Sequence, residues 1–159
     1  MRQIVGVADM IVSNNVQESI VTYSLGSCIG LVIYDPAVQV GGLLHYMLPE
    51  SKIDRDKAAR KPFMFADTGI PRLFKSAYKL GAKKQRIHIF VAGGAEILDQ
   101  KGFFNIGKRN YMALKKIFLK NRVLIDKEQV GGNVNRTVRL DIGTGDVFVK
   151  TSGSKEEKV

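Results

Sequence analysis

Cysteine, histidine and tryptophan are scarce in this chain of 159 residues, which contains one cysteine, two histidines and no tryptophan. A lone cysteine excludes a disulfide within the chain, and a free thiol of this kind is typical of proteins in a reducing compartment. The two histidines lie far apart in the sequence and join no cluster with the ligand spacing of a zinc site. The composition therefore predicts a cytoplasmic protein without a metal centre.

Long hydrophobic runs are also absent. No run approaches the ~20 apolar residues that a helix needs to cross a bilayer, so membrane insertion is not expected. The apolar stretch near the N-terminus is short and is interrupted by Asp9, which makes it a poor signal peptide. A chain of this length fits a single domain, which we expect to span residues 1–150, followed by a flexible polar tail at 151–159.

Acidic residues are in short supply, with 15 Asp and Glu against 25 Lys and Arg, so the formal net charge is +10. Such a charge favours encounters with acidic partners, either nucleic acid or an acidic protein surface. The basic residues are spread along the chain, and neither an RNA-recognition motif nor a zinc finger accompanies them. We interpret them as a solvated basic surface, with a nucleic-acid-binding module as a remote alternative.

What the chain does contain is a cysteine and a histidine in a pattern typical of a β-hairpin. Residues 29–34 are rich in aliphatic and other β-forming side chains, residues 40–47 are again apolar, and a turn signal with proline separates the two runs. A two-residue loop at 36–37 would set Cys28 directly opposite His45, with Cβ atoms about 5 Å apart. A bulge or a longer loop would instead turn one of the two side chains to the other face of the sheet.

A thiol and an imidazole at this distance form the core of a cysteine nucleophile, because the imidazole can take the thiol proton. The loop residues Gly26 and Ser27 provide a tight turn and backbone N–H groups that could stabilise an oxyanion. A hydroxyl group could orient the imidazole, and Thr22 is the first candidate for it, with Ser24 and Ser27 as rivals. The alternative is structural, since lone cysteines are often small buried side chains within a core.

The rest of the chain predicts a mixture of strands and helices. Residues 50–60 are charged and poor in apolar side chains, which favours a surface loop, either a lid or partner-binding segment or a plain solvated connector. Gly93 and Gly94 could hold an anion ahead of a short helix at 95–99, but a tight structural turn fits them better. Further strands are expected at 3–8, 19–24, 86–91, 123–125, 136–142 and 147–149, and helices at 67–80, capped by Asp67 or Thr68, and at 106–122, capped by Asn105. This order favours an α/β (α+β) fold with mixed sheets and with helices on one side.

Seven residues around the cysteine, Thr22–Cys28, resemble the T-x-x-L-G-S-C signature of the CheD family of chemoreceptor glutamine deamidases. The agreement continues in family order from about Gly6 to Val149. The further blocks that carry it are His45–Pro49, Phe65–Thr68, Gly93–Ala95, Asn105–Asn110 and Gly131–Asn133. The sequence departs from the family pattern at Tyr23–Ser24, where glycine-containing loops are common, and at Phe65, where tyrosine is common. Neither departure removes a group expected to be catalytic.

The resemblance implies a cytosolic cysteine hydrolase of bacterial or archaeal chemotaxis that converts selected receptor glutamines to glutamates and releases ammonia. It implies a layered α/β/β fold, related to that of glutamine-deamidating toxins. It also implies Cys28 as the nucleophile, His45 as general base and acid and Thr22 as the orienting residue, with neither a metal nor an organic cofactor. The implied partners are the helical cytoplasmic part of chemoreceptors and the CheC phosphatase, and we expect the chain alone to be a monomer.

Two other functions stay open at this point. A non-catalytic adaptor would use the same surface to bind chemoreceptors and CheC, and signalling would follow from occupancy alone. A cysteine peptidase or another amidase would use the same thiol and imidazole on a different bond.

Overall fold

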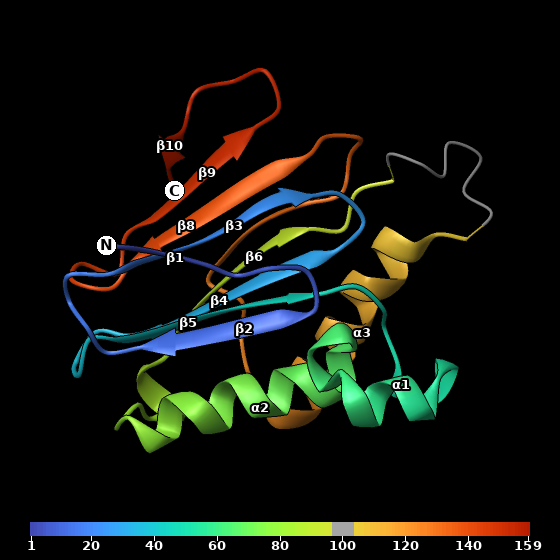
Figure 1. The fold of residues 1–159 in the computed structure, drawn as a ribbon, viewed down its shortest axis with the longest axis horizontal. Coiled ribbons are helices and arrows are strands. Elements are labelled where there is room, and N and C mark those ends of the chain that lie inside the picture. The colour runs from blue at the N-terminus through green and yellow to red at the C-terminus, as the bar shows by residue number, and fades with distance from the viewer. Residues whose placement is uncertain (97–103) are drawn as a thin grey trace.

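Two sheets lie face to face in the computed structural model, which describes residues 1–96 and 104–159 (Figure 1). The first sheet has the order β1 (Arg2–Ile4), β3 (Ser19–Leu25), β8 (Arg136–Asp141), β9 (Val147–Thr151) and β10 (Glu157–Lys158). The second has the order β2 (Asp9–Ser13), β5 (Val40–Tyr46), β4 (Ile29–Asp35), β6 (His88–Gly93) and β7 (Lys127–Val130). Both sheets are mixed, because β1 runs parallel to β3 and β7 parallel to β6, while the other neighbours are antiparallel.

The helices α2 (Ala66–Lys79) and α3 (Ile106–Asn121) cover the second sheet on the side that faces away from the first (Figure 1). Further helical elements are α1 (Arg55–Arg60) and the short 3₁₀ turns η1 (Ser51–Ile53), η2 (Pro62–Met64) and η3 (Lys84–Arg86). This is the α/β/β layering that the sequence predicts, and the fold class is confirmed. Within the described ranges, no helix combines the length and the apolar character that crossing a bilayer requires.

The second sheet is buried on both faces, which explains why its central strand β4 is buried at every residue and apolar up to its last residue, Asp35. Alternate side chains of this strand go to different layers. Ile29, Leu31 and Ile33 pack with the helices, whereas Val32 and Tyr34 pack between the two sheets. Each such side chain stabilises the fold by about 1.5–3 kcal/mol when fully buried. The layer between the sheets is also where the cysteine and its surroundings lie.

The predicted β4–β5 hairpin is present, but its predicted register is wrong by two residues. Asp35 pairs with Val40 across a four-residue turn, so the loop is longer than the predicted two residues. His45 therefore lies opposite Gly30 and not opposite Cys28. Because a shift of two residues preserves the alternation of side chains, Cys28 and His45 still belong to the same face of the sheet.

The longer turn follows from the interactions of Asp35, which is fully buried. Its carboxylate accepts hydrogen bonds from the N–H of Ala37 and the N–H of Lys83, both at 2.9 Å, and pairs with Arg86 at 2.9 Å. These bonds hold the pKa of Asp35 below its usual range, against burial, which by itself would raise that pKa. Two of the three partners come from about fifty residues further on, so the turn sequence alone gives no sign of them.

Several other expected elements differ from the structure. The predicted surface loop at 50–60 is wrong, because it contains η1 and α1, and Asp54 caps α1 by accepting from the N–H of Lys57. Asp67 does not cap α2 but accepts from Ser51, and the cap residue is Phe65. The strand expected at 123–125 is wrong, since β7 begins at Lys127. The strand expected at 3–8 ends at Ile4, and β2 follows it unpredicted.

Other expectations agree with the structure. The long helices α2 and α3 are confirmed, as are β3, β6, β8 and β9 within a few residues. The short helix considered at 95–99 falls mostly outside the described residues. The segment expected as a flexible tail carries β10, which pairs with β9, and the N–H of Val159 donates to Val147 at 2.9 Å.

Candidate active site

The loop Gly26–Cys28 crosses from the first sheet to the second, joining β3 to β4. Its three consecutive carbonyl groups all accept hydrogen bonds at 2.9 Å. Gly26 accepts from the N–H of Ala95, Ser27 from the side-chain amide of Asn110, and Cys28 from the N–H of Gly94. The peptide planes of the loop are therefore fixed from one side by residues that follow β6 and by a residue of α3.

Fixed carbonyls also fix the N–H groups, because the two groups of a trans peptide point in opposite directions. The N–H groups of Ser27 and Cys28 thus point away from the residues that bind the carbonyls. Neither donates to another residue in the described part of the chain. Two free donors therefore lie beside the thiol, which is the arrangement that stabilises a developing oxyanion.

Gly93 is the residue against which the loop packs most closely. A Cβ atom there would lie 2.1 Å from the carbonyl oxygen of Cys28, and the φ angle is +110°. Both the space and the backbone conformation require glycine at this position. The predicted interpretation of Gly93 and Gly94 as a structural turn fits this packing, since the N–H of Gly94 binds the Cys28 carbonyl.

A β-bulge in β3 prepares the approach to the loop. Tyr23 and Ser24 together occupy the space opposite Thr137, and Ser24 has a φ angle of +56°. The extra residue returns Leu25 to the buried layer between the sheets, on the same side as Thr22. Ser24 itself is exposed on the surface, so this alternative to Thr22 does not orient the buried imidazole of His45.

His45 and Thr22 meet between the two sheets, one from β5 and the other from β3. The Thr22 hydroxyl lies 2.7 Å from Nδ1 of His45 and 2.8 Å from the carbonyl oxygen of Val5. A carbonyl only accepts, so the single hydroxyl proton goes to Val5, and Nδ1–H of His45 donates to Thr22. This tautomer leaves Nε2 with a free lone pair. Nε2 has no hydrogen-bond partner in the described ranges.

Burial keeps both reactive groups neutral in the resting site. His45 is 1% exposed, and removal from water lowers its pKa from 6.5 to about 4. Burial raises the pKa of the Cys28 thiol, and the backbone N–H of the same residue offsets this effect in part. At neutral pH the pair is therefore thiol and imidazole, not thiolate and imidazolium. The imidazole can act as a base only when a proton is transferred to it.

The structure places Cys28 on the same face of the sheet as His45, two positions beyond the residue that faces it. Such diagonal neighbours lie about 7–8 Å apart between Cα atoms. Cys28 packs against the core between the sheets but keeps partial exposure to solvent. The thiol is thus partly open to solvent, whereas the imidazole is buried.

Several known proteins are similar to this chain. A family model described as "CheD chemotactic sensory transduction" matches residues 47–151. A protein of Syntrophus aciditrophicus named "Probable chemoreceptor glutamine deamidase CheD 1" is 61% identical over 150 residues, which cover 94% of each chain. A protein of Solibacter usitatus named "Probable chemoreceptor glutamine deamidase CheD" is 49% identical to this chain. A protein of Anaeromyxobacter dehalogenans named "Probable chemoreceptor glutamine deamidase CheD 2" is 44% identical. They cover 98% and 92% of this chain and 92% of each relative.

The chain belongs to the CheD family. The family model begins after Cys28 and His45, so its match does not itself include them. The match to the Syntrophus CheD protein covers 94% of the chain. The unmatched remainder is shorter than the segment 22–45, so this match includes most of the segment that contains Cys28 and His45. The resemblance noted for the sequence motifs is therefore confirmed across nearly the whole chain.

Two buried residues beside the CheD site are not identified as site residues by sequence reasoning. Asn110 is fully buried and binds the loop before Cys28, as described above. Arg136 is 9% exposed, and its guanidinium donates to the carbonyls of Gly93 and Gly131 at 3.1 and 2.9 Å. Burial lowers the pKa of Arg136. Asn110 lies within a block of the family motif, which is the only signal that could have found it, and nothing marks Arg136.

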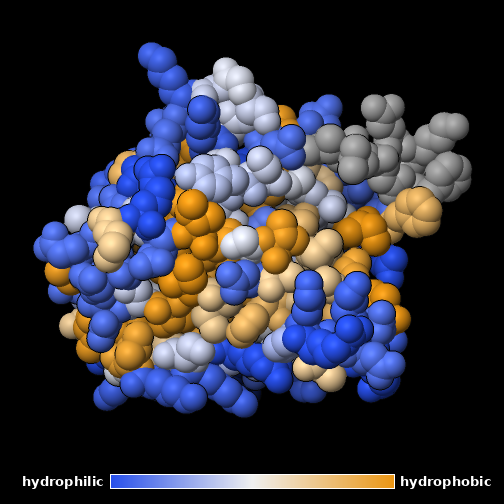
Figure 2. Space-filling view, viewed as in Figure 1, coloured by the Kyte–Doolittle hydropathy of each residue, from blue (hydrophilic) through white to orange (hydrophobic). Residues whose placement is uncertain are grey.

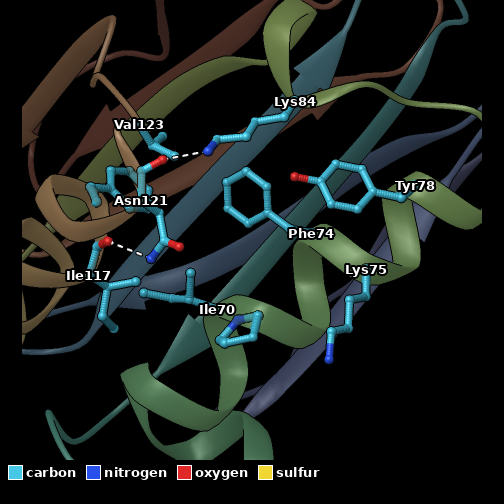
Figure 3. A pocket seen from close by; sticks show the side chains of 10 residues that line it. Ile70, Phe74, Lys75, Tyr78, Lys84, Ile117, Asn121 and Val123 are labelled. Carbon is cyan, nitrogen blue, oxygen red and sulfur yellow. Dashed lines mark hydrogen bonds between the residues drawn. The ribbon is translucent and has the colours of Figure 1, made fainter.

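The surface of this CheD-family chain offers other hollows, away from the loop. One lies between α2 and α3, and its lining is mostly apolar with two lysines and an asparagine at the rim (Figure 3). Phe74 packs at its centre, and Lys84 donates to the Asn121 carbonyl. In the face shown in Figure 2, a band of hydrophobic residues crosses the middle, with hydrophilic residues above and below it. The hollow between α2 and α3 includes neither the cysteine nor the buried histidine.

Proposed function

We propose that this chain is a chemoreceptor glutamine deamidase, a protein-glutamine glutaminase with a cysteine nucleophile. The observation that carries the proposal is the state of His45. Its Nδ1–H is held by Thr22, and its free Nε2 lies on the face that also bears the Cys28 thiol. The curated relatives carry the same activity in their names. We propose Cys28 as nucleophile, His45 as general base and acid, and Thr22 as the residue that positions the imidazole.

The reaction begins with transfer of the Cys28 thiol proton to Nε2 of His45. The sulfur attacks the side-chain carbonyl carbon of a receptor glutamine, and the oxyanion that forms accepts hydrogen bonds from the N–H groups of Ser27 and Cys28. His45 returns the proton to the amide nitrogen, the C–N bond breaks, and ammonia leaves. A γ-glutamyl thioester remains on Cys28.

The second half hydrolyses this thioester. His45 takes a proton from water, the resulting hydroxide attacks the thioester carbonyl, and the C–S bond breaks with return of the proton to sulfur. The net change is glutamine plus water to glutamate plus ammonia. Each step uses only groups of this chain and the substrate, so no metal or organic cofactor is required.

The substrate in this proposal is the helical cytoplasmic part of a chemoreceptor, and the protein acts in the cytoplasm as a monomer. The formal charge of +10 favours its encounter with acidic helical surfaces. We expect binding to a receptor fragment to weaken clearly as salt rises. Binding that is unchanged between low and high salt would contradict the electrostatic contribution. The CheC phosphatase is a second proposed partner, on the basis of the family resemblance.

Ammonia release from a purified receptor cytoplasmic fragment tests the proposal. The unaltered chain is expected to release ammonia, and Cys28→Ala to release none above background. A non-catalytic adaptor would release no ammonia, whether unaltered or as Cys28→Ala, and the two chains would bind the receptor fragment equally. A peptidase would cut the receptor fragment, which a denaturing gel would show directly.

A further inference from the structure

The side chain of Asn110 binds the backbone next to both proposed catalytic residues, Cys28 and His45. Its side-chain amide donates to the carbonyl of Ser27 at 2.9 Å and to the carbonyl of Met47 at 2.8 Å. Ser27 directly precedes Cys28, and Met47 follows His45 by two residues. Both neighbours are carbonyl oxygens, so only the NH₂ end of the amide can face them, and both of its protons are used.

The rest of α3 is built to bring this amide close to the loop. Gly107 lies one turn before Asn110, and a Cβ atom there would lie 2.3 Å from the carbonyl oxygen of Ala95. The helix therefore approaches the backbone after β6 as closely as glycine allows. The hydroxyl of Tyr46, a fully buried residue, donates to the backbone carbonyl of Asn110 at 2.6 Å. The position of the amide is thus fixed by contacts from the helix and from β5.

The direction of the Ser27 carbonyl determines the direction of the Cys28 N–H group. The two belong to one planar peptide and point in opposite directions. The N–H of Cys28 has no acceptor on another residue in the described ranges 1–96 and 104–159. With its carbonyl held on Asn110, this N–H group is kept pointing away from the Asn110 amide.

We propose that Asn110 is a positioning residue that aims the Cys28 N–H group at the oxyanion of the acyl-transfer transition state. The inference rests on the proposed function, since it assigns a role within cysteine-based acyl transfer. It differs from a structural role in one respect. Loss of the amide would slow reactions of Cys28 that pass through an oxyanion more than reactions that do not.

Two small reagents separate these roles, because Cys28 is the only cysteine in the chain. p-Nitrophenyl acetate acylates the thiol through a tetrahedral oxyanion, whereas iodoacetamide alkylates it by direct displacement without one. Both need the thiol proton to move to His45. The ratio of the acylation rate to the alkylation rate therefore reports on oxyanion stabilisation separately from the thiol–imidazole pair.

The test variant is Asn110→Asp, which keeps the size of the side chain and removes the NH₂ group. Removal of one oxyanion donor slows enzymes by about 10²–10³, so a donor turned away should lower the rate ratio by about tenfold or more. The matched control is Asn121→Asp in the same helix, where the side-chain amide donates to the Ile117 carbonyl far from the loop. That control is expected to leave the ratio within about twofold.

Asn110→Ser provides a second variant if Asn110→Asp does not fold, as judged by circular dichroism and thermal melting. Its hydroxyl can donate one of the two bonds, so an intermediate ratio is expected. Equal slowing of both reagents would overturn the proposal and assign Asn110 to the thiol–imidazole geometry or to the fold. An unchanged ratio would overturn it as well. A chain that releases no ammonia from receptors would contradict the proposed function instead, and the reagent ratio would still decide the role of Asn110.

Discussion

Two regions of this molecule differ in what they expose and in what they bury. The hollow between α2 and α3 is open and mostly apolar, and Phe74 packs at its centre (Figure 3). Polar groups are buried around the loop Gly26–Cys28, among them Thr22, His45 and Asn110. Among the described residues, the buried side-chain polar atoms without a hydrogen-bond partner are His45 Nε2 and the Asn110 side-chain oxygen.

The difference shows that chemistry in this fold is marked by buried polar groups and not by the shape of the surface. Burying a polar group without a partner costs free energy. The fold holds the unpaired Nε2 of His45 in place despite this cost. Apolar hollows between helices follow from imperfect packing of two amphipathic faces and need no function.

The largest difference between the regions is expected in activity. Cys28→Ala and His45→Gln should each lower ammonia release by about 10³-fold or more, because each removes one half of the nucleophile and base pair. Lys84→Ala and Tyr78→Phe, in the hollow, should stay within about twofold. Steady-state kinetics on a receptor fragment measure both sets. A large loss in a hollow variant would remove the distinction between the two regions.

The next effect is a dependence of stability on pH that belongs to His45. Its pKa in the folded protein is about 4, below the ordinary 6.5, so the unfolded chain binds the extra proton between these values. The stabilisation is fully present above about pH 6.5 and is lost as pH falls toward 4, by about 3 kcal/mol in total.

Urea unfolding at pH 7 and at pH 4.5 measures this dependence. His45→Gln should remove most of it. The same lowered pKa predicts that activity persists well below pH 6.5 in the acid direction. An acid limb of the rate profile near pH 6.5 would contradict a desolvated imidazole.

A smaller effect is expected from the hydroxyl that orients the imidazole. Thr22→Val keeps the shape of the side chain but leaves the Nδ1–H of His45 and the carbonyl of Val5 without partners. The rate should fall by about tenfold to a hundredfold, and stability by about 1–3 kcal/mol. Thr22→Ser keeps the hydroxyl and should restore most of the rate. Failure of that rescue would assign Thr22 to packing.

The smallest expected effect is on stability, and it comes from relief of backbone strain at one residue near each region. Ser24 in the bulge and Arg122 at the end of α3 have φ angles of +56° and +57°. Replacement of either by glycine should stabilise the protein by about 0.5–1 kcal/mol, as relief of left-handed strain exceeds the added freedom of the unfolded chain. Thermal melting measures this, and neither change should alter activity. Destabilisation by Ser24→Gly would show that its side chain holds the bulge.

Local patterns in the sequence predict most of the layered fold. The periodic apolar residues of α2 and α3 and the short apolar runs of β4 and β5 are strong signals, since each pattern matches the burial of its element. The register of the hairpin is not predictable locally, because the partners of Asp35 at Lys83 and Arg86 lie far along the chain. Likewise α1 is too short and charged to show an apolar stripe, and its stability comes from its cap and its packing.

The residues of the candidate site also differ in whether the sequence predicts them. Cys28 and His45 are evident because their side chains are rare in this chain, and Thr22 because of its place in the family motif. Asn110 and Arg136 act on backbone carbonyls, which every residue has, so their partners leave no mark in the sequence. Contacts from side chain to backbone are thus the part of this site that only the structure reveals.

Intact mass spectrometry of a chemoreceptor cytoplasmic fragment is the most direct test of the central claim. After incubation with the unaltered chain, the fragment is expected to stay uncut and to gain about one dalton for each deamidated glutamine. Incubation with Cys28→Ala or with His45→Gln should leave its mass unchanged. An equal gain in mass with Cys28→Ala, or cleavage of the fragment by the unaltered chain, would contradict the account.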